Sequence, residues 1–259
     1  MLGAIAGDII GSRFKFKNCT SKDFELFADD SVFTDNTVCT VSILDTLFNK
    51  KDETKNLLDW CRRYPDLNYD RNFKKWINSQ NPLPYQSVGN GEAARVSAVG
   101  WFANTIREYR ELCDRVTKIT HYHSAERTGA QAVAYAIYTT KLGILDFQWI
   151  RERIECVCRY DLAKSVDQLR EEHKFNETYH GTIVPQALIC CLNATDFEDA
   201  IRNAISIGGD SSAIAAITGS IAEAKWGVPN SIRDEVWSRL PEDIKEVLSL
   251  VYLPEKWTR

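Results

Sequence analysis

The chain has 259 residues, of which 44% are hydrophobic and 26% charged, a composition typical of one large folded domain or two small ones. Its net charge of −4 argues against a nucleic-acid-binding surface, and no apolar run approaches the roughly 18 residues that a membrane span needs. The N-terminal MLGAIAGDIIGSRF has no basic region before its apolar stretch, which Asp8 interrupts, so we expect a cytoplasmic protein without membrane or nucleic-acid partners.

Apolar residues recur with helical spacing along much of the chain. In residues 37–48 (TVCTVSILDTLF) they fall every three positions. Residues 124–143 (SAERTGAQAVAYAIYTTKLG) are rich in alanine and end in a basic turn followed by a glycine suited to a C-cap. Further predicted helices, the first two joined through a glycine pair, cover residues 197–210, 212–227, 232–240 and 241–251.

Two-residue alternation, which is typical of half-buried strands, is absent. We therefore predict an all-α fold, a many-helix bundle that forms a single domain over residues 1–259. The stretch 50–90 is polar, aromatic and interrupted by prolines, which favours a long surface loop with a functional role.

Two segments carry small residues at helical spacing, and small faces allow helix backbones to approach closely. The positions are Gly3, Gly7 and Gly11 in the first segment and Ala215, Gly219 and Ala222 in the second. We expect these two helices to pack in a dense centre.

The eight cysteines are scattered through apolar or helical segments, and none shows the Cys-x-x-Cys spacing of zinc or redox motifs. Reduced and mostly buried thiols are the expectation, as in a cytosolic protein.

Thr34, Asp35, Asn36 and Thr37 form a compact group of oxygen-bearing side chains of the kind that a hard cation selects. Asp and Thr directly before a helical run are also ordinary N-cap residues, because their side chains accept hydrogen bonds from the free first-turn N–H groups. Taken alone, this stretch favours the N-cap interpretation.

Three other stretches combine flexible backbone with polar side chains. Residues 208–212 (GGDSS) precede a helix and suit either a helix cap or an anion. Residues 89–91 (GNG), with Arg95 one helical turn later, suit a diphosphate. A zinc site at His121 and His123 would need further ligands that the sequence does not offer, so a hydrogen-bonding role is favoured.

In this order, the stretches resemble the ADP-ribosylglycohydrolase family, an all-α family that includes the dinitrogenase-reductase-activating glycohydrolases. The resemblance runs nearly end to end through GAIAGDIIGSRF, FTDNTVCT, GNGEAARVSAVGW, THYHSAERTGAQAVA, GTIVPQAL and DFEDAIRNAISIGGDSSAIAAITGSIAEA. It implies a cleft in which two divalent cations, usually magnesium or manganese, hold the distal ribose of ADP-ribose and help to deliver water. The family ligands come from Thr-Asp-Asp-Thr and Gly-Gly-Asp-Ser/Thr-Asp-Thr, with a Glu after the first helix at the reaction centre.

Carried over by position, that metal site is only partly present. Three positions keep the family pattern: Thr34, Asp35 and Asp210. Four depart from it: Lys15, Asn36, Ser212 and Ala213, where the family has Glu, Asp, Asp and Thr. A family charge of −5 thereby becomes about −1, which is too little to hold two divalent ions.

We expect no cofactor, or at most one weakly held Mg or Mn on the remnant ligands Thr34, Asp35 and Asp210. In our hypothesis the ammonium of Lys15 replaces the missing cations and offsets the cost of burying the two carboxylates. Asp35, Asp210 and Lys15 are then the candidate catalytic groups.

The rest of the ligand site follows the family more closely, although THYHSAER and Ala94 depart from its usual residues. The resemblance implies that the ligand is lined by Gly89, Asn90, Gly91, His121, Gly209, Ser211 and Ser212. Arg95 also matches the family, although a structural ion pair explains it equally well.

Three functions fit these observations. The first is a protein without the two-metal centre that binds ADP-ribose or an ADP-ribosylated protein or small molecule. The second is an active, metal-independent hydrolase of an ADP-ribosyl or related glycosidic bond, with Asp35 or Asp210 as base and Lys15 steadying the substrate. The third is a structural protein that keeps only the fold.

Overall fold

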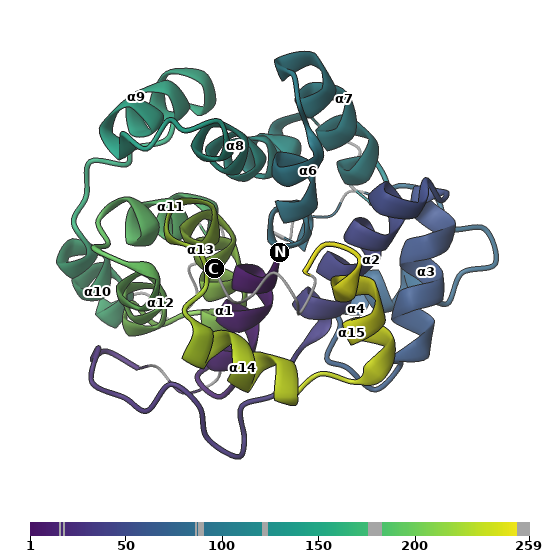
Figure 1. Ribbon diagram of the computed structural model, residues 1–259, viewed down its shortest axis with the longest axis horizontal. Helices are drawn as coiled ribbons and strands as arrows, with labels where there is room; N and C mark the ends of the chain where they lie inside the picture. Colours follow the sequence, from purple (N-terminus) through teal and green to yellow (C-terminus); the bar gives the residue numbers. More distant parts are fainter. Residues whose placement is uncertain are drawn as a thin grey trace.

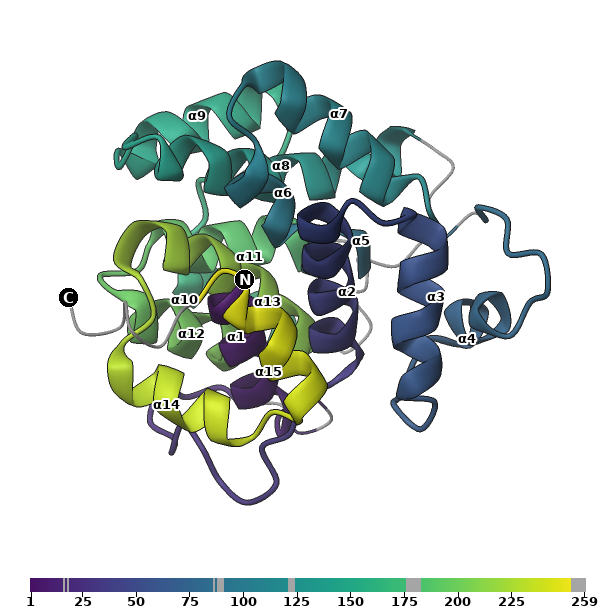
Figure 2. The ribbon, with the colours of Figure 1, turned by 45° about the vertical axis from the view of Figure 1, so that its right-hand side comes forward.

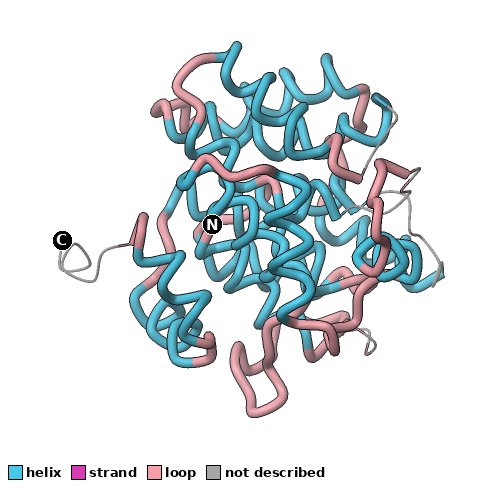
Figure 3. The backbone as a smooth tube through the Cα atoms, turned by 90° about the vertical axis from the view of Figure 1, so that its right-hand side faces the viewer, coloured by secondary structure: helices cyan, strands magenta, loops and turns pink. Residues whose placement is uncertain are grey.

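The computed structural model describes residues 1–15, 17, 19–85, 87, 91–120, 124–175 and 183–252, with the side chains of 124–126 and 173–175 left aside. This part of the chain forms fifteen helices and no strand, which confirms the predicted all-α fold (Figure 3). The helices are α1 (Leu2–Ser12), α2 (Asp35–Asn49), α3 (Glu53–Arg63), α4 (Arg71–Ile77), α5 (Gly91–Arg95), α6 (Ser97–Phe102), α7 (Ile106–Thr117), α8 (Ser124–Lys141), α9 (Phe147–Cys158), α10 (Val166–Phe175), α11 (Ile183–Leu192), α12 (Phe197–Ser206), α13 (Ser211–Trp226), α14 (Asn230–Ser238) and α15 (Glu242–Ser249).

Helices α1 and α13 pack against each other at the centre of the molecule (Figure 1). Their small residues meet directly: a Cβ on Gly7 would lie 1.9 Å from the carbonyl oxygen of Ala215, and a Cβ on Gly3 would lie 2.2 Å from that of Gly219. No side chain larger than hydrogen fits at such positions. The two small-residue stripes predicted from the sequence therefore form one helix–helix contact.

The other helices surround this pair in groups. Helices α11 and α12 pack on α13, whereas α2 packs on α1 and carries α3 and α15 on its other sides. Helices α6, α7 and α9 all pack on α8, and in Figure 2 they form a layer above the remaining helices. No helix in the described part of the chain is long and apolar enough to cross a membrane.

Helix ends follow the sequence signals closely. Gly208 and Gly209 have φ values of 80° and 74°, which explains why the turn from α12 to α13 needs two glycines. Gly143, at φ 89°, follows the end of α8 as predicted. Pro241 directly precedes α15 as its N-cap residue and does not belong to the first helical turn.

The stretch 50–90 is not a long surface loop, so that prediction was wrong. It contains α3 and α4, whose N-cap residues are Asp52 and Asp70. Trp60 on α3 and Trp76 on α4 are only 1% and 5% exposed. The polar residues that suggested a loop occupy the outer faces of two short amphipathic helices, whose apolar faces join the core.

Candidate functional site

Three segments of the chain meet at one polar centre: α1 with the turn that follows it, the start of α2 and the start of α13. They bring together three carboxylates and one ammonium, which we call the acidic cluster: Asp8, Asp35, Asp210 and Lys15. Asp8 belongs to α1, Asp35 is the first residue of α2, and Asp210 is the N-cap residue of α13. Residues far apart in sequence therefore share one polar centre.

Asp8 is the most buried member of the acidic cluster, with no exposed surface. Its Oδ1 accepts a hydrogen bond from the Thr34 hydroxyl at 2.6 Å, and its Oδ2 accepts from the Thr34 N–H at 2.8 Å and from the Thr37 hydroxyl at 2.6 Å. Burial raises the pKa of Asp8, although these hydrogen bonds oppose the shift. Both oxygens of this carboxylate are thus engaged with the start of α2.

Asn36 completes this arrangement as a donor. Its Nδ2 lies 3.2 Å from both Asp8 Oδ1 and Thr34 Oγ1, and 3.5 Å from Ser212 Oγ. The opposite orientation of the amide would set its oxygen against the Asp8 carboxylate, so the hydrogen-bond network fixes which atom faces inward. An amide nitrogen cannot ligate a cation, and it occupies the space beside Asp8.

Lys15 forms the ion pair with Asp210 that the sequence hypothesis requires, with Nζ 3.5 Å from Oδ2. Burial lowers the pKa of Lys15, but the charges of Asp210, Asp35 and Asp8 outweigh that effect, so the net shift is upward and the amine stays protonated. The other oxygen of Asp210 accepts hydrogen bonds from the Ser212 hydroxyl at 3.0 Å and from the Ala213 N–H at 3.3 Å.

Asp35 differs from the other two carboxylates. Its Oδ1 is buried and has no hydrogen-bond partner in the described part of the chain. Burial raises the pKa of Asp35 to about 6; the Lys15 ammonium opposes this shift, and the charges of Asp8 and Asp210 add to it. The cluster thus holds one carboxyl group that changes protonation close to neutral pH.

The oxygens of two carboxylates of the acidic cluster are engaged by internal donors. Asp8 and Asp210 use their oxygens on hydroxyl, amide and ammonium donors, and the amide of Asn36 points a nitrogen inward. Among the described residues, no group of three or more His, Cys, Asp or Glu side chains is placed to hold a metal ion.

The predicted ligand-binding residues on α13 are enclosed. Ser211 and Ser212 are fully buried. The Ser211 hydroxyl donates to the Phe14 carbonyl at 3.3 Å, and the Ser212 hydroxyl binds Asp210. Gly209 forms the turn before the helix, where its carbonyl accepts the Ser211 N–H at 2.9 Å. In this structure the start of α13 therefore contacts the acidic cluster, through the hydrogen bond from Ser212 to Asp210.

The second predicted ligand segment is only partly described. Gly91 is exposed at the start of α5, and a Cβ built on it would meet no atom within 4 Å. Arg95 is buried and donates to the Thr120 hydroxyl at 2.8 Å and to the Val116 carbonyl at 3.3 Å, so it joins α5 to the end of α7. Gly89, Asn90, His121 and His123 lie outside the described residues.

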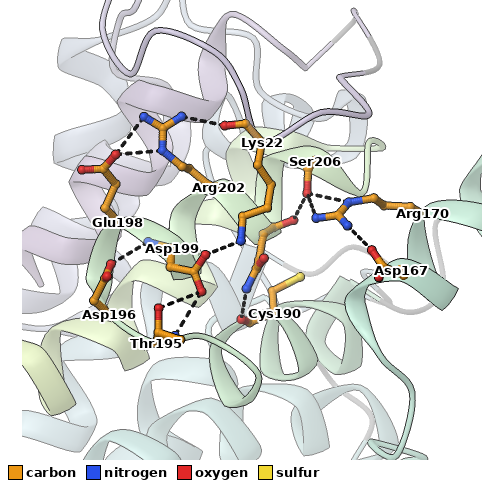
Figure 4. Close-up of polar contacts among 11 residues, drawn as sticks. Lys22, Asp167, Arg170, Cys190, Thr195, Asp196, Glu198, Asp199, Arg202 and Ser206 are labelled. Carbon is orange, nitrogen blue, oxygen red and sulfur yellow. Dashed lines mark hydrogen bonds and ion pairs between the residues drawn. The ribbon is translucent and has the colours of Figure 1, made fainter.

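The segment between α1 and α2, which carries Lys15, is tied to the helices around it. Arg202 on α12 donates to the carbonyls of Lys22 and Phe24 at 2.7 and 2.8 Å, and the Lys22 ammonium pairs with an aspartate of α12 (Figure 4). Arg239, the C-cap residue of α14, donates to two further carbonyls of the same segment, both at 2.9 Å. Both arginines also pair with the glutamate four residues before them. These contacts fix the backbone that follows Lys15.

The structure thus defines an all-helical protein with a buried acidic centre at its core helices. The sequence matches the ADP-ribosylglycohydrolase family over residues 1–257, so the chain belongs to that family. A solved structure described as an "ADP-ribosylglycohydrolase-related protein complex" shares the fold, with a TM-score of 0.66 and 18% identity over 96% of this chain and 94% of that chain.

A protein from Archaeoglobus fulgidus, described only as uncharacterized, is 32% identical over 151 residues. The match covers 52% of this chain and 48% of that protein, so the similar region spans about half the length of this relative.

Sequence reasoning missed Asp8 as a member of the site. The signal was present, because a lone carboxylate interrupts the apolar stretch of the first helix. A charged residue on a helix that is buried along most of its length needs partners. Those partners, Thr34 and Thr37, belong to the group of oxygen-bearing side chains that the sequence singled out, and Thr34 was one of the predicted remnant metal ligands.

Proposed function

We propose that this protein binds ADP-ribose, or an ADP-ribosylated protein or small molecule, in a cleft whose two-metal centre has been replaced by internal hydrogen bonds and an ion pair. The observation that carries the proposal is the Lys15–Asp210 pair, together with the Asn36 amide that donates to Asp8. In the family pattern, acidic residues stand at positions 15 and 36. Here a cation and an amide donor balance the remaining carboxylates without metal.

Family membership supports the choice of ligand. The open space at Gly91 also supports it, because a ligand can approach the backbone there without meeting a side chain of the described residues. The Lys15 ammonium has three N–H donors, one of which faces Asp210, so it would also donate to a ribose hydroxyl.

Calorimetric titration with ADP-ribose in the presence of EDTA tests this function. We expect saturable binding without metal, and Gly91→Leu should abolish it because the new side chain fills the space that the ligand needs. The variant should keep its stability, since no atom lies within 4 Å of an added Cβ. Lys55→Leu at an exposed site on α3 is the matched control. A protein that keeps only the fold would show no saturable binding, and that result would refute the proposal.

A second candidate, a metal-independent hydrolase, is favoured by one observation. The buried Oδ1 of Asp35 has no partner among the described residues, so it is free to accept a proton or a hydrogen bond from an attacking water. Incubation with ADP-ribosyl-arginine and ADP-ribosyl-serine peptides separates the candidates. Turnover that survives EDTA supports the hydrolase, whereas turnover that EDTA abolishes contradicts the metal-free site.

The loss of the metal centre has its own test in a variant that restores the family residues: Lys15→Glu, Asn36→Asp, Ser212→Asp and Ala213→Thr. Without metal, the added buried carboxylates should lower the melting temperature of this variant. Magnesium should then raise its melting temperature by about 5 °C or more, because a ligand that binds only the folded state stabilises it. We expect no magnesium effect on the parent protein; an increase there would count against the proposal.

A further inference from the structure

A hollow lies between α7, α8 and α9, three helices of the upper layer in Figure 2. Its volume is about 650 Å³, and all of its lining residues come from these three helices. None of them belongs to the acidic cluster or to the segments proposed to bind ADP-ribose. Cavities of this size between the helices of a bundle are typical of small-molecule sites.

One part of the hollow is aromatic and apolar. The rings of Tyr109 and Tyr135 lie 6.0 Å apart between centroids, at an angle of 62°. The Tyr109 hydroxyl is held by a 2.7 Å hydrogen bond to the carbonyl of Gln131, which fixes its ring. Ile106 and Val157 also line the hollow and leave 44% and 71% of their surfaces exposed. This surface suits a flat apolar body.

The carboxylates that line the hollow have ion-pair partners, whereas its arginines do not within the described part of the chain. The two lining carboxylates have partners: Glu111 pairs with Arg107 at 2.8 Å, and Asp114 pairs with Arg127 and Lys118. The two lining arginines, Arg110 and Arg153, form no ion pair with any carboxylate in the described part of the chain. Arg153 lies over the ring of Trp149 instead, 5.9 Å from its centroid. The hollow therefore has two guanidinium groups whose hydrogen-bond donors remain for an anion.

We propose that this hollow binds a small amphipathic anion. Its flat aromatic body would pack on Tyr109 and Tyr135, and its carboxylate or phosphate would reach Arg110 or Arg153. The Gln131 amide and the Tyr135 hydroxyl, which form no side-chain hydrogen bond within the described residues, add neutral polar contacts. This site is separate from the proposed ADP-ribose cleft and does not rest on it.

Three ligands with one common body test the proposal: 2-naphthoate, 2-naphthyl phosphate and the neutral 2-naphthamide. Calorimetry should show at least about fivefold tighter binding of one or both anions than of the amide, because charge-assisted hydrogen bonds are the stronger ones. A comparison of the two anions then tells a carboxylate ligand from a phosphate ligand.

Two variants separate the contributions of the head group and the body. Arg110→Ala with Arg153→Ala should remove the preference for the anions and leave the affinity for the amide unchanged. Tyr135→Ala should weaken all three ligands. Arg71→Ala with Lys74→Ala, at two exposed positions on α4, removes the same charge elsewhere and should retain the preference. Circular dichroism checks the folding of each variant; the exposed arginine pair decides the outcome if Tyr135→Ala unfolds.

Equal affinity for the charged and neutral ligands would overturn the proposal. So would an anion preference that survives the double arginine substitution, or the absence of saturable binding by all three ligands at millimolar concentration.

Discussion

At the scale of single residues, the acidic cluster shows how neighbouring carboxylates acquire different properties. Asp8 is satisfied by the start of α2, Asp210 by the start of α13 and by Lys15, and Asp35 keeps one buried oxygen without a partner in the described residues. Burial raises the pKa of both Asp8 and Asp35, and the hydrogen bonds that Asp8 accepts oppose the shift there, as the Lys15 ammonium does at Asp35. Asp35 is therefore a group at which a change of pH near neutrality has an effect.

Asp35→Asn gives a pH-dependent test of that conclusion. The pKa of Asp35 is about 6 in the folded protein, against 3.8 in the absence of the fold, so the folded state binds the proton more tightly. Between these values the stability that Asp35 contributes falls as pH rises, whereas a neutral asparagine is unaffected. The free energy of unfolding of the variant, relative to the parent, should therefore increase by up to about 3 kcal/mol from pH 4 to pH 7.

Urea unfolding at intervals across this range measures the difference. Asp59→Asn, on the exposed face of α3, should give a flat line against pH. A flat line for Asp35→Asn as well would contradict the burial of its carboxylate.

At the scale of helices, the contact between α1 and α13 sets the position of the whole cluster. The backbones come so close that Gly7 and Gly219 have no room for a Cβ atom. This approach places Asp8, one residue after Gly7, beside the first turns of α2 and α13. The close contact between α1 and α13 therefore both packs the small residues and positions Asp8.

Gly7→Ala should destabilise the protein by about 3 kcal/mol or more, because the added methyl group would lie 1.9 Å from a backbone oxygen that cannot move alone. Denaturant unfolding gives the magnitude. Gly91→Ala is the matched control, since its added methyl group meets nothing within 4 Å. A loss below about 1 kcal/mol at Gly7 would show that the two helices shift apart easily.

At the scale of the whole molecule, the exposure of each of the eight cysteines depends on how the helices cover the core. All eight are free thiols, and five of them are buried: Cys39, Cys61, Cys113, Cys190 and Cys191. Cys156, by contrast, is exposed on α9. Cys158 lies two residues later, at the end of α9. Burial raises the pKa of its thiol to about 11, so little thiolate forms there.

Iodoacetamide should therefore modify Cys156 first in the native protein, with Cys158 reacting far more slowly despite its closeness in sequence. Intact mass and peptide mapping follow the order of reaction. In denaturant without reductant, eight adducts are expected because no disulfide withholds a thiol. Fast labelling of Cys39 or Cys61 in the native state would show that α2 and α3 separate in solution.

Much of this architecture could be predicted from local sequence patterns. Helical periodicity, the glycine pair before α13 and the alanine-rich α8 follow from short-range rules, and the structure confirms them. The prediction of a loop over residues 50–90 was wrong because the polar residues on the outer faces of α3 and α4 obscured the apolar pattern of their inner faces. The local pattern there is short, and only the surrounding core shows which face is inside.

The sequence by itself determined that this chain is all-helical and belongs to the ADP-ribosylglycohydrolase family, and it drew attention to Lys15 and Asn36. Only the tertiary structure decided what those residues do, with Lys15 paired to Asp210 and Asn36 donating to Asp8. The physical reason is that a charge is stabilised or destabilised by whatever lies within a few ångströms of it, from any part of the chain. Helix formation depends on near neighbours in sequence, whereas electrostatic balance depends on neighbours in space.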